Sequence, residues 1–198
     1  MKYIFYGLGI LILSLGISLT IQSGLGTFDA LLVGLSKEVG LTVGSWEVLI
    51  SVILLICNAI LTRKKPILLG LITAFITGIG IDLWLFVVKN TLYLNALLSK
   101  LICFGIGLVL IGLGTAIYLQ TKFASTPIDH LTLIIRDLSK RTILFSRTLV
   151  YALFLVLAII FKGPIGIGTL LTVCLGGMLL HVFMPIVERH FLLKNRRG

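Results

Sequence analysis

Six long apolar segments constrain this 198-residue chain more than any other feature of its sequence. They cover residues 3–22, 43–61, 66–88, 101–120, 144–161 and 164–187. A helix rises about 1.5 Å per residue, so about 20 apolar residues cross the roughly 30 Å hydrocarbon core of a bilayer. Each segment approaches or exceeds that length. The pattern predicts an all-α integral membrane protein with six transmembrane helices.

The composition points to the same class. Hydrophobic residues make up 58% of the chain and charged residues 12%, with a mean hydropathy of +1.17. Soluble domains carry about 25% charged residues, so too little polar surface remains here to coat a water-soluble body. Soluble enzymes, nucleic-acid-binding modules and disordered tails are excluded. The net charge of +10 is assigned to loops at the membrane surface and not to nucleic acid.

The basic residues predict that both termini are cytoplasmic. With six spans and the N-terminus inside, thirteen of the seventeen Lys and Arg residues fall on the cytoplasmic side. Residues 3–22 mimic a signal peptide but are long for one, and no cleavage pattern follows. We therefore expect a retained first span and a single membrane domain over residues 1–198, ending in a short basic tail over 189–198.

The chain repeats itself after 98 residues. Glycines at 7, 9 and 16 fall on glycines at 105, 107 and 114, and the Pro66, Gly70 and Gly78 pattern falls on Pro164, Gly168 and Gly176. Repeat one covers about 3–90 and repeat two about 101–188, with three spans in each. An odd number of spans inverts the second copy relative to the first, which is typical of secondary transporters. The alternative is a duplicated scaffold without transport.

Each repeat also contains one short helix, over residues 27–39 and 126–139. At about 20 Å, neither is long enough to span the membrane. Apolar residues recur at helical spacing in both. These are Phe28, Leu31, Leu32 and Leu35 in the first, and Ile128, Leu131, Ile135 and Leu138 in the second. The two segments are either amphipathic helices at the interface or half-helices that dip into the bundle.

The starts of the short helices carry the candidate binding residues. Thr27 and Thr126 are placed as N-caps, with Asp29 and Asp129 in the first turn. Local capping alone accounts for these residues. If the helices dip inward, the same N-termini point at a central cavity, where the carboxylates would bind a cation or an amino group and the Thr and Gln side chains would add neutral ligands. The predicted substrate-binding residues are Gln22, Thr27, Asp29, Gln120, Thr126 and Asp129.

Asp82 is a second candidate site, for ion or proton coupling. It ends a stripe of small residues, Gly70, Ala74 and Gly78, which predicts that it faces protein. In the second copy His181 lies one residue beyond the matching position, so it is a candidate partner. The alternative is an acid near the end of its span that reaches toward water.

Motifs for catalysis are missing from the sequence. There is no zinc-protease helix, nucleophile elbow or phosphate-binding loop, so we expect no enzyme and no cofactor. Cys57, Cys103 and Cys174 lie singly in apolar segments and suggest neither disulfides nor a metal cluster. Without an ATPase domain, active transport would need an ion gradient or another subunit.

The segment Gly24-Leu25-Gly26-Thr27-Phe28-Asp29 resembles the YczE/YyaS/YitT group of bacterial multi-pass membrane proteins. The preceding Gln22-Ser23 and the Lys-Lys-Pro turn at 64–66 add to this resemblance, which covers most of the chain and is closest to the YczE-like branch. It implies a location in the bacterial plasma membrane and carries over no functional residues.

Two functions from different classes remain. The first is a gradient-driven transporter of a small polar solute or ion. The second is an accessory or regulatory membrane subunit, without transport of its own, in a secretion, biosynthetic or transport complex. Expected partners are the lipid bilayer and the solute or ion, with no nucleic acid. A homodimer or a partner membrane subunit is compatible with either function.

Overall fold

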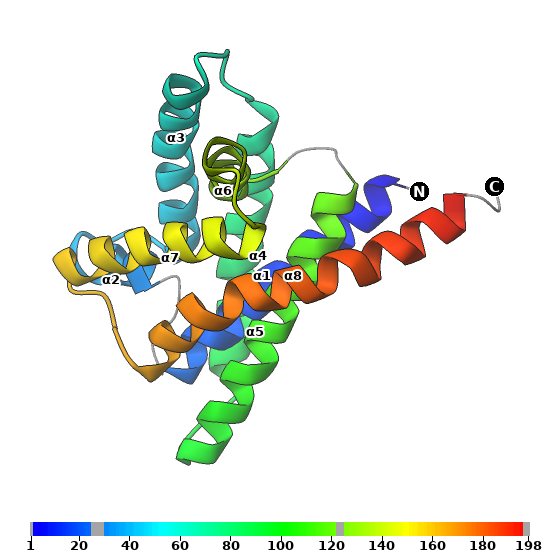
Figure 1. Cartoon of the computed structure of the whole chain (residues 1–198). Coiled ribbons are helices and arrows are strands. Elements are labelled where there is room, and N and C mark those ends of the chain that lie inside the picture. Colours follow the sequence, from blue (N-terminus) through cyan, green and yellow to red (C-terminus); the bar gives the residue numbers. More distant parts are fainter. Residues whose placement is uncertain (1, 25–29, 122–124, 196–198) are drawn as a thin grey trace.

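The computed structural model describes residues 2–24, 30–121 and 125–195 (Figure 1). In these ranges the chain forms eight α-helices. They are α1 (Lys2–Ser23), α2 (Ala30–Glu38), α3 (Val43–Thr62), α4 (Leu69–Thr91), α5 (Leu97–Gln120), α6 (Pro127–Ser139), α7 (Ile143–Ile160) and α8 (Ile167–Asn195). The all-helical prediction is therefore confirmed for the described residues.

Five of the predicted spans coincide with helices that are long and apolar enough to cross a membrane. These are α1, α3, α4, α5 and α7. The sixth predicted span, 164–187, falls largely within α8, a helix of 29 residues that contains Pro185. Membrane crossing by α8, and with it the six-span arrangement, stays a prediction. The helix also continues to Asn195, so residues 189–195 of the predicted tail are helical.

Large apolar side chains cover the outward faces of the helices. On α4, Phe75, Leu83 and Phe86 are 56%, 56% and 72% exposed. The surfaces of α3, α5 and α7 are similarly rich in exposed Leu, Ile and Val. Soluble monomers rarely expose apolar surface on this scale, so it marks the area that a bilayer covers.

Glycines bring α1 and α5 into close antiparallel contact. A Cβ atom built on Gly9 would lie 3.0 Å from the Gly114 carbonyl oxygen, and one on Gly16 would lie 2.7 Å from the Gly107 carbonyl oxygen. Small residues let helices in a membrane approach through their backbones, where van der Waals packing stabilises the pair. The two first spans of the predicted repeats thus form the centre of the bundle, with α4 packed against α1 and α8 against α5.

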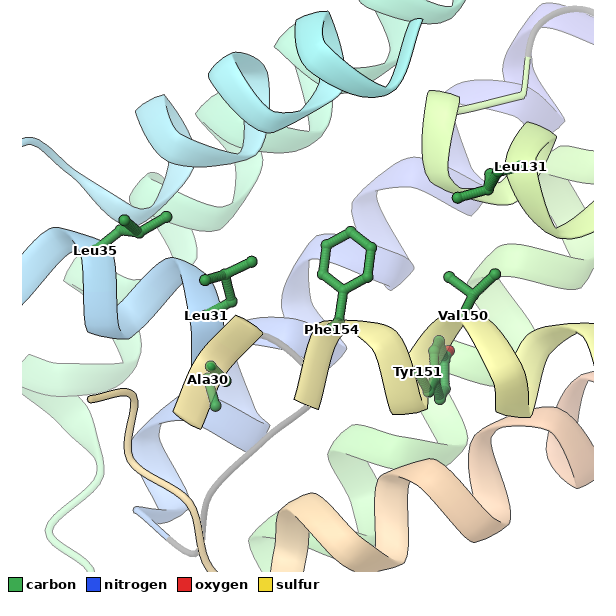
Figure 2. Packing of buried hydrophobic residues seen from close by; sticks show 8 residues of the cluster. Ala30, Leu31, Leu35, Leu131, Val150, Tyr151 and Phe154 are labelled. Carbon is green, nitrogen blue, oxygen red and sulfur yellow. The ribbon is translucent and has the colours of Figure 1, made fainter. Parts of the chain in front are cut away.

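The short helices both pack between the middle spans, since α2 and α6 each contact α3 and α7. Figure 2 shows Leu31 of α2 and Leu131 of α6 on either side of Phe154 and Val150 of α7, and these residues belong to one buried cluster. Both short helices are therefore held by tertiary packing against the bundle.

The predicted apolar faces are largely confirmed. Leu31, Leu32 and Leu35 are buried in α2, whereas Phe28 lies outside the described residues. In α6 Leu131 is buried, and Ile128 and Ile135 pack against the cluster of Figure 2. The predicted face is wrong at Leu138, which is 67% exposed because it borders an open cavity between α3 and α6.

Alanine at Gly16 is expected to lower the free energy of unfolding by about 1–3 kcal/mol, because its Cβ would meet the Gly107 carbonyl and the Ile111 amide at 2.7 Å. Thermal unfolding in detergent measures the change. Gly7→Ala is the matched control on the same helix, since its Cβ would meet nothing within 4 Å. Equal midpoints for the two variants would show that α1 and α5 do not depend on this contact.

Candidate functional site

The first turn of α6 builds the core of the site. Thr126 is the N-cap, with an extended ψ of 152°, and its hydroxyl accepts a hydrogen bond from the Asp129 backbone N–H at 3.3 Å. Pro127 occupies the first helical position, where its missing N–H costs nothing. The predicted cap is confirmed here. The cap turns Asp129 toward the interior, where its side chain is buried.

Asp129 pairs with Arg147 of α7 inside the bundle. Arg147 Nη1 donates to Asp129 Oδ1 at 2.7 Å, and both side chains are only 7% exposed. The second carboxylate oxygen, Oδ2, accepts from the Thr126 hydroxyl at 2.8 Å and from the Tyr118 hydroxyl. Arg147 Nε donates to the Tyr151 hydroxyl at 2.7 Å. The pair thus ties α5, α6 and α7 together.

Burial makes this pair costly to break. Removing two charges from water costs several kcal/mol per ion, and the mutual attraction offsets that cost only when the remaining hydrogen-bonding groups are satisfied. Here both oxygens of Asp129 have donors, and the Arg147 guanidinium also lies 5.2 Å from the centroid of the Tyr151 ring. A change that removes one partner would leave an uncompensated charge in an apolar interior.

The ion pair lines a central cavity of about 50 Å³. Its walls come from α1, α3, α4, α5, α6, α7 and α8. The polar lining residues are Glu47, Thr77, Thr115, Thr126, Asp129, Thr132, Arg147, Tyr151 and Thr172. A water molecule needs about 10–15 Å³ of such space, whereas pockets for drug-sized ligands measure about 300–1,000 Å³. In this conformation the cavity therefore has room for a small ion or a few water molecules.

Thr115 has the most informative side chain in the cavity. It is fully buried, and its Oγ1 has no hydrogen-bond partner among the described residues. The hydroxyls of Thr77 and Thr172, by contrast, donate to the carbonyls of Thr73 at 2.8 Å and Gly168 at 2.9 Å. A buried polar group left without a partner costs about 1–3 kcal/mol. A polar occupant of the cavity would remove this cost.

Glu47 adds a second carboxylate to the cavity wall. It belongs to the first turns of α3, and its side chain is half-buried. Glu47 and Arg147 occupy similar places near the starts of the two middle spans, where residues at the membrane interface are expected. The structure instead brings the two side chains to the lining of the same cavity.

The predicted glutamines lie elsewhere. Gln22 Nε2 donates to the Leu92 carbonyl at the end of α4, at 3.2 Å, and Gln120 Nε2 donates to the Met184 carbonyl of α8, at 3.5 Å. Neither lines the cavity. Thr27 and Asp29 lie outside the described residues. Of the six predicted substrate-binding residues, the structure therefore brings Thr126 and Asp129 together.

Asp82 faces protein, as the small-residue stripe predicts, and its partner is a helix terminus. Its Oδ1 accepts from the Gly44 backbone N–H at 2.9 Å, in the first turn of α3. A carboxylate there satisfies an unpaired amide and favours the helix dipole. His181 is exposed on α8, and no hydrogen bond or ion pair joins it to Asp82 in the described part of the chain. Their role in coupling stays a prediction.

Sequence reasoning missed Arg147, Tyr118, Tyr151 and Thr115 as site residues. A signal was available for Arg147, because a basic residue inside an apolar segment normally has an acidic partner. Tyr151 follows it by one helical turn, which places both on one face of α7. No comparable signal exists for Thr115, since a threonine in an apolar helix usually bonds to its own backbone.

Comparison with known proteins agrees with the predicted resemblance. Residues 1–185 match the model of a family described as "Family of unknown function (DUF6198)". The chain belongs to this family. It is 95% identical to "Uncharacterized protein YyaS" of Bacillus subtilis (strain 168), over the full length of both chains. It is 31% identical to "Uncharacterized membrane protein YczE" of the same organism, over 93% of this chain and 86% of that protein.

These relatives confirm the predicted YczE/YyaS family, with higher identity to YyaS than to YczE. No solved structure matches the chain. The membrane relative and the five long apolar helices together show a multi-pass membrane protein.

Replacing Arg147 by Met is expected to lower the free energy of unfolding by about 3–5 kcal/mol, because Asp129 would stay buried without a counter-charge. Denaturation in detergent measures this loss. The control is Arg136→Gln, which breaks an exposed pair with Asp137 whose side chains are 42% and 68% exposed. It should change stability by less than about 1 kcal/mol. A similar small effect for both variants would contradict the structural role of the buried pair.

Proposed function

We propose that this protein is a gradient-driven transporter of a small polar solute or ion, and that the central cavity is its binding site. One observation carries the proposal: Thr115, whose buried hydroxyl has no partner among the described residues, lines the same cavity as the Asp129–Arg147 pair. Charged residues within a membrane are costly and usually face a cavity that serves function. The cavity also lies where seven of the helices meet, as expected for a transport site between two halves.

The pattern of contacts supports two inverted repeats of three spans each. Under the 98-residue shift, the contact of Gly9 with Gly114 becomes a contact of Gly107 with Gly16, and both are present. Such reciprocal contacts arise when a two-fold axis relates equivalent surfaces. Contacts between helices correspond in the same way. The contact of α1 with α4 in the first repeat corresponds to that of α5 with α8 in the second, and the contact of α3 with α4 corresponds to that of α7 with α8. Across the repeats, the contact of α2 with α7 corresponds to that of α6 with α3.

The cavity itself follows this relation. Leu13 and Ile17 of α1 line it together with their counterparts in the second repeat, Ile111 and Thr115 of α5. In transporters with inverted repeats, the substrate site lies at the interface of the repeats near the bilayer midplane. The position of Thr115, matched by an apolar isoleucine in the first repeat, makes the binding site polar on one side.

The lining favours a small cation or an amino group. Glu47, Asp129 and several threonines line the cavity, and the hard oxygen ligands that such side chains carry suit small hard cations. A cation that binds Asp129 competes with Arg147 for the same carboxylate. Entry of the cation would therefore release the guanidinium, and its departure would restore the ion pair that joins α6 to α7. This exchange links occupancy to the packing of the short helix.

A different observation favours the accessory subunit. Both oxygens of Asp129 are satisfied within the chain, as a purely structural ion pair requires. In that case the cavity holds only structural water and no solute passes through it. The two functions therefore differ in whether the lining of the cavity is reached from water.

Thiol accessibility tests this difference. In a background without Cys57, Cys103 and Cys174, we expect Thr115→Cys to react with a membrane-impermeant thiol reagent in vesicles, because a transport cycle exposes the cavity to water. Val150→Cys is the control, since Val150 is 1% exposed, packs in the cluster of Figure 2 and does not line the cavity. If both thiols stay unmodified, the transport proposal is wrong and the accessory role is favoured.

Binding is tested by thermal shift with Li⁺, Na⁺, K⁺, ammonium and methylammonium salts. A ligand at one hundred times its dissociation constant stabilises the folded state by about 2.7 kcal/mol. We expect Thr115→Val to lose this shift while folding as well as or better than the wild type, because it removes an unsatisfied hydroxyl without changing the volume much. Thr20→Val is the control, since the Thr20 hydroxyl donates to the Ile17 carbonyl and lies outside the cavity lining.

A cation that binds is then supplied to proteoliposomes under an imposed gradient. Uptake that Thr115→Val abolishes and Thr20→Val retains would support transport. Binding without uptake would leave a site for a structural ion and would contradict the transporter.

A further inference from the structure

A second, larger cavity lies on the other side of α6. It measures about 460 Å³ and runs between the end of α3, the loop that follows, and α6. We call it the α3–α6 groove. Asp129 and Thr132 of α6 line the central cavity, whereas His130, Ile134 and Leu138 line the groove. The groove is therefore separate from the site proposed for transport, and its size lies within the range of small-molecule sites.

The groove carries positive charge at its entrance. Lys64 and Lys65 line it from the loop after α3, and both are exposed. The acidic residue in its lining, Asp137, pairs with Arg136 at 2.8 Å. Burial lowers the pKa of His130 below its ordinary value, so its ring is neutral at pH 7 and offers one N–H donor. Because Arg136 already neutralises the Asp137 carboxylate, the ammonium groups of Lys64 and Lys65 give the groove a net positive charge.

Asn58 lines the groove and has an unsatisfied acceptor. The residue is 3% exposed, and its Nδ2 donates to the Pro127 carbonyl at 2.8 Å. Its Oδ1 is buried and has no partner among the described residues. Because that oxygen can only accept, it requires a donor such as a hydroxyl group. An occupant that satisfies the whole groove must carry an anionic group for the lysines and a hydroxyl for Asn58.

The rim of the groove is apolar. Leu61, Ile67 and Leu138 line it and are 51%, 50% and 67% exposed. Lys64 and Lys65 follow α3, a helix long enough to span the membrane, so we expect them at the level of the lipid headgroups. A free anion would make no use of the apolar rim, whereas the acyl chains of a lipid would cover it.

We propose that the α3–α6 groove binds the headgroup of an anionic phospholipid. The phosphate lies against Lys64 and Lys65, a headgroup hydroxyl donates to Asn58 Oδ1, and the acyl chains pack on the apolar rim. Basic pockets between helices at the membrane surface bind phosphate-bearing headgroups in this way. The inference goes beyond the proposed transport function and does not depend on it.

Native mass spectrometry of the full-length protein in detergent tests the proposal. Phosphatidylglycerol, which has a phosphate and two hydroxyls, is titrated beside phosphatidylcholine with the same acyl chains. We expect preferential binding of phosphatidylglycerol. Its affinity should fall about thirtyfold in Lys64→Gln/Lys65→Gln, since each lysine near an anionic headgroup contributes about fivefold to the affinity. The control, Lys140→Gln/Arg141→Gln, removes the same charge from exposed residues that do not line the groove.

Retained binding in the control and loss in the groove variant would support the proposal. Equal losses of affinity in the groove variant and the control, or equal binding of phosphatidylglycerol and phosphatidylcholine, would overturn it. The attraction would then not be specific to the groove or to the anionic headgroup. Displacement of the lipid by millimolar inorganic phosphate would identify a free anion as the occupant and would also overturn it. Thermal midpoints without added lipid check the fold. If the double variant unfolds, the single variant Lys65→Gln is titrated with phosphatidylglycerol instead, and its affinity is expected to fall about fivefold.

Discussion

The buried pair of Asp129 and Arg147 is the interaction on which the centre of this structure depends. It joins a short helix to a middle span, and the Tyr118 hydroxyl extends the network to α5. A carboxylate and a guanidinium in an apolar interior are stable only together, so α6 and α7 hold each other in position. The pair lies in the wall of the central cavity, to which four further helices contribute.

The α6 helix has a distinct role because both of its faces are used. One face presents Asp129 and Thr132 to the central cavity, and the other presents His130 and Ile134 to the α3–α6 groove. The bond from Asn58 to the Pro127 carbonyl fixes the start of the helix from the groove side. Contacts on either face therefore act on the same short element, which has few residues of its own to resist displacement.

Local features of the site were predictable. Thr126 and Asp129 form a cap because the hydroxyl and the amide are only three residues apart, so the sequence contains both partners. Asp82 was correctly expected to face protein from its row of small residues, but its partner, the Gly44 amide, lies 38 positions away on another helix. Gln22 and Gln120 were expected near the cavity, yet they bond to α4 and α8, because packing sets the rotation of α1 and α5 about their axes.

The sequence by itself determined the membrane class, the approximate positions of the helices, the Thr126 cap and the family, because hydropathy, helical spacing and capping are properties of neighbouring residues. Only the tertiary structure decided that Arg147 pairs with Asp129, that Thr115 lines the same cavity and that the Asn58 Oδ1 has no partner among the described residues. These facts depend on how helices far apart in the chain approach and rotate. Close glycine contacts such as that between α1 and α5 set this geometry, and no local pattern of residues records it.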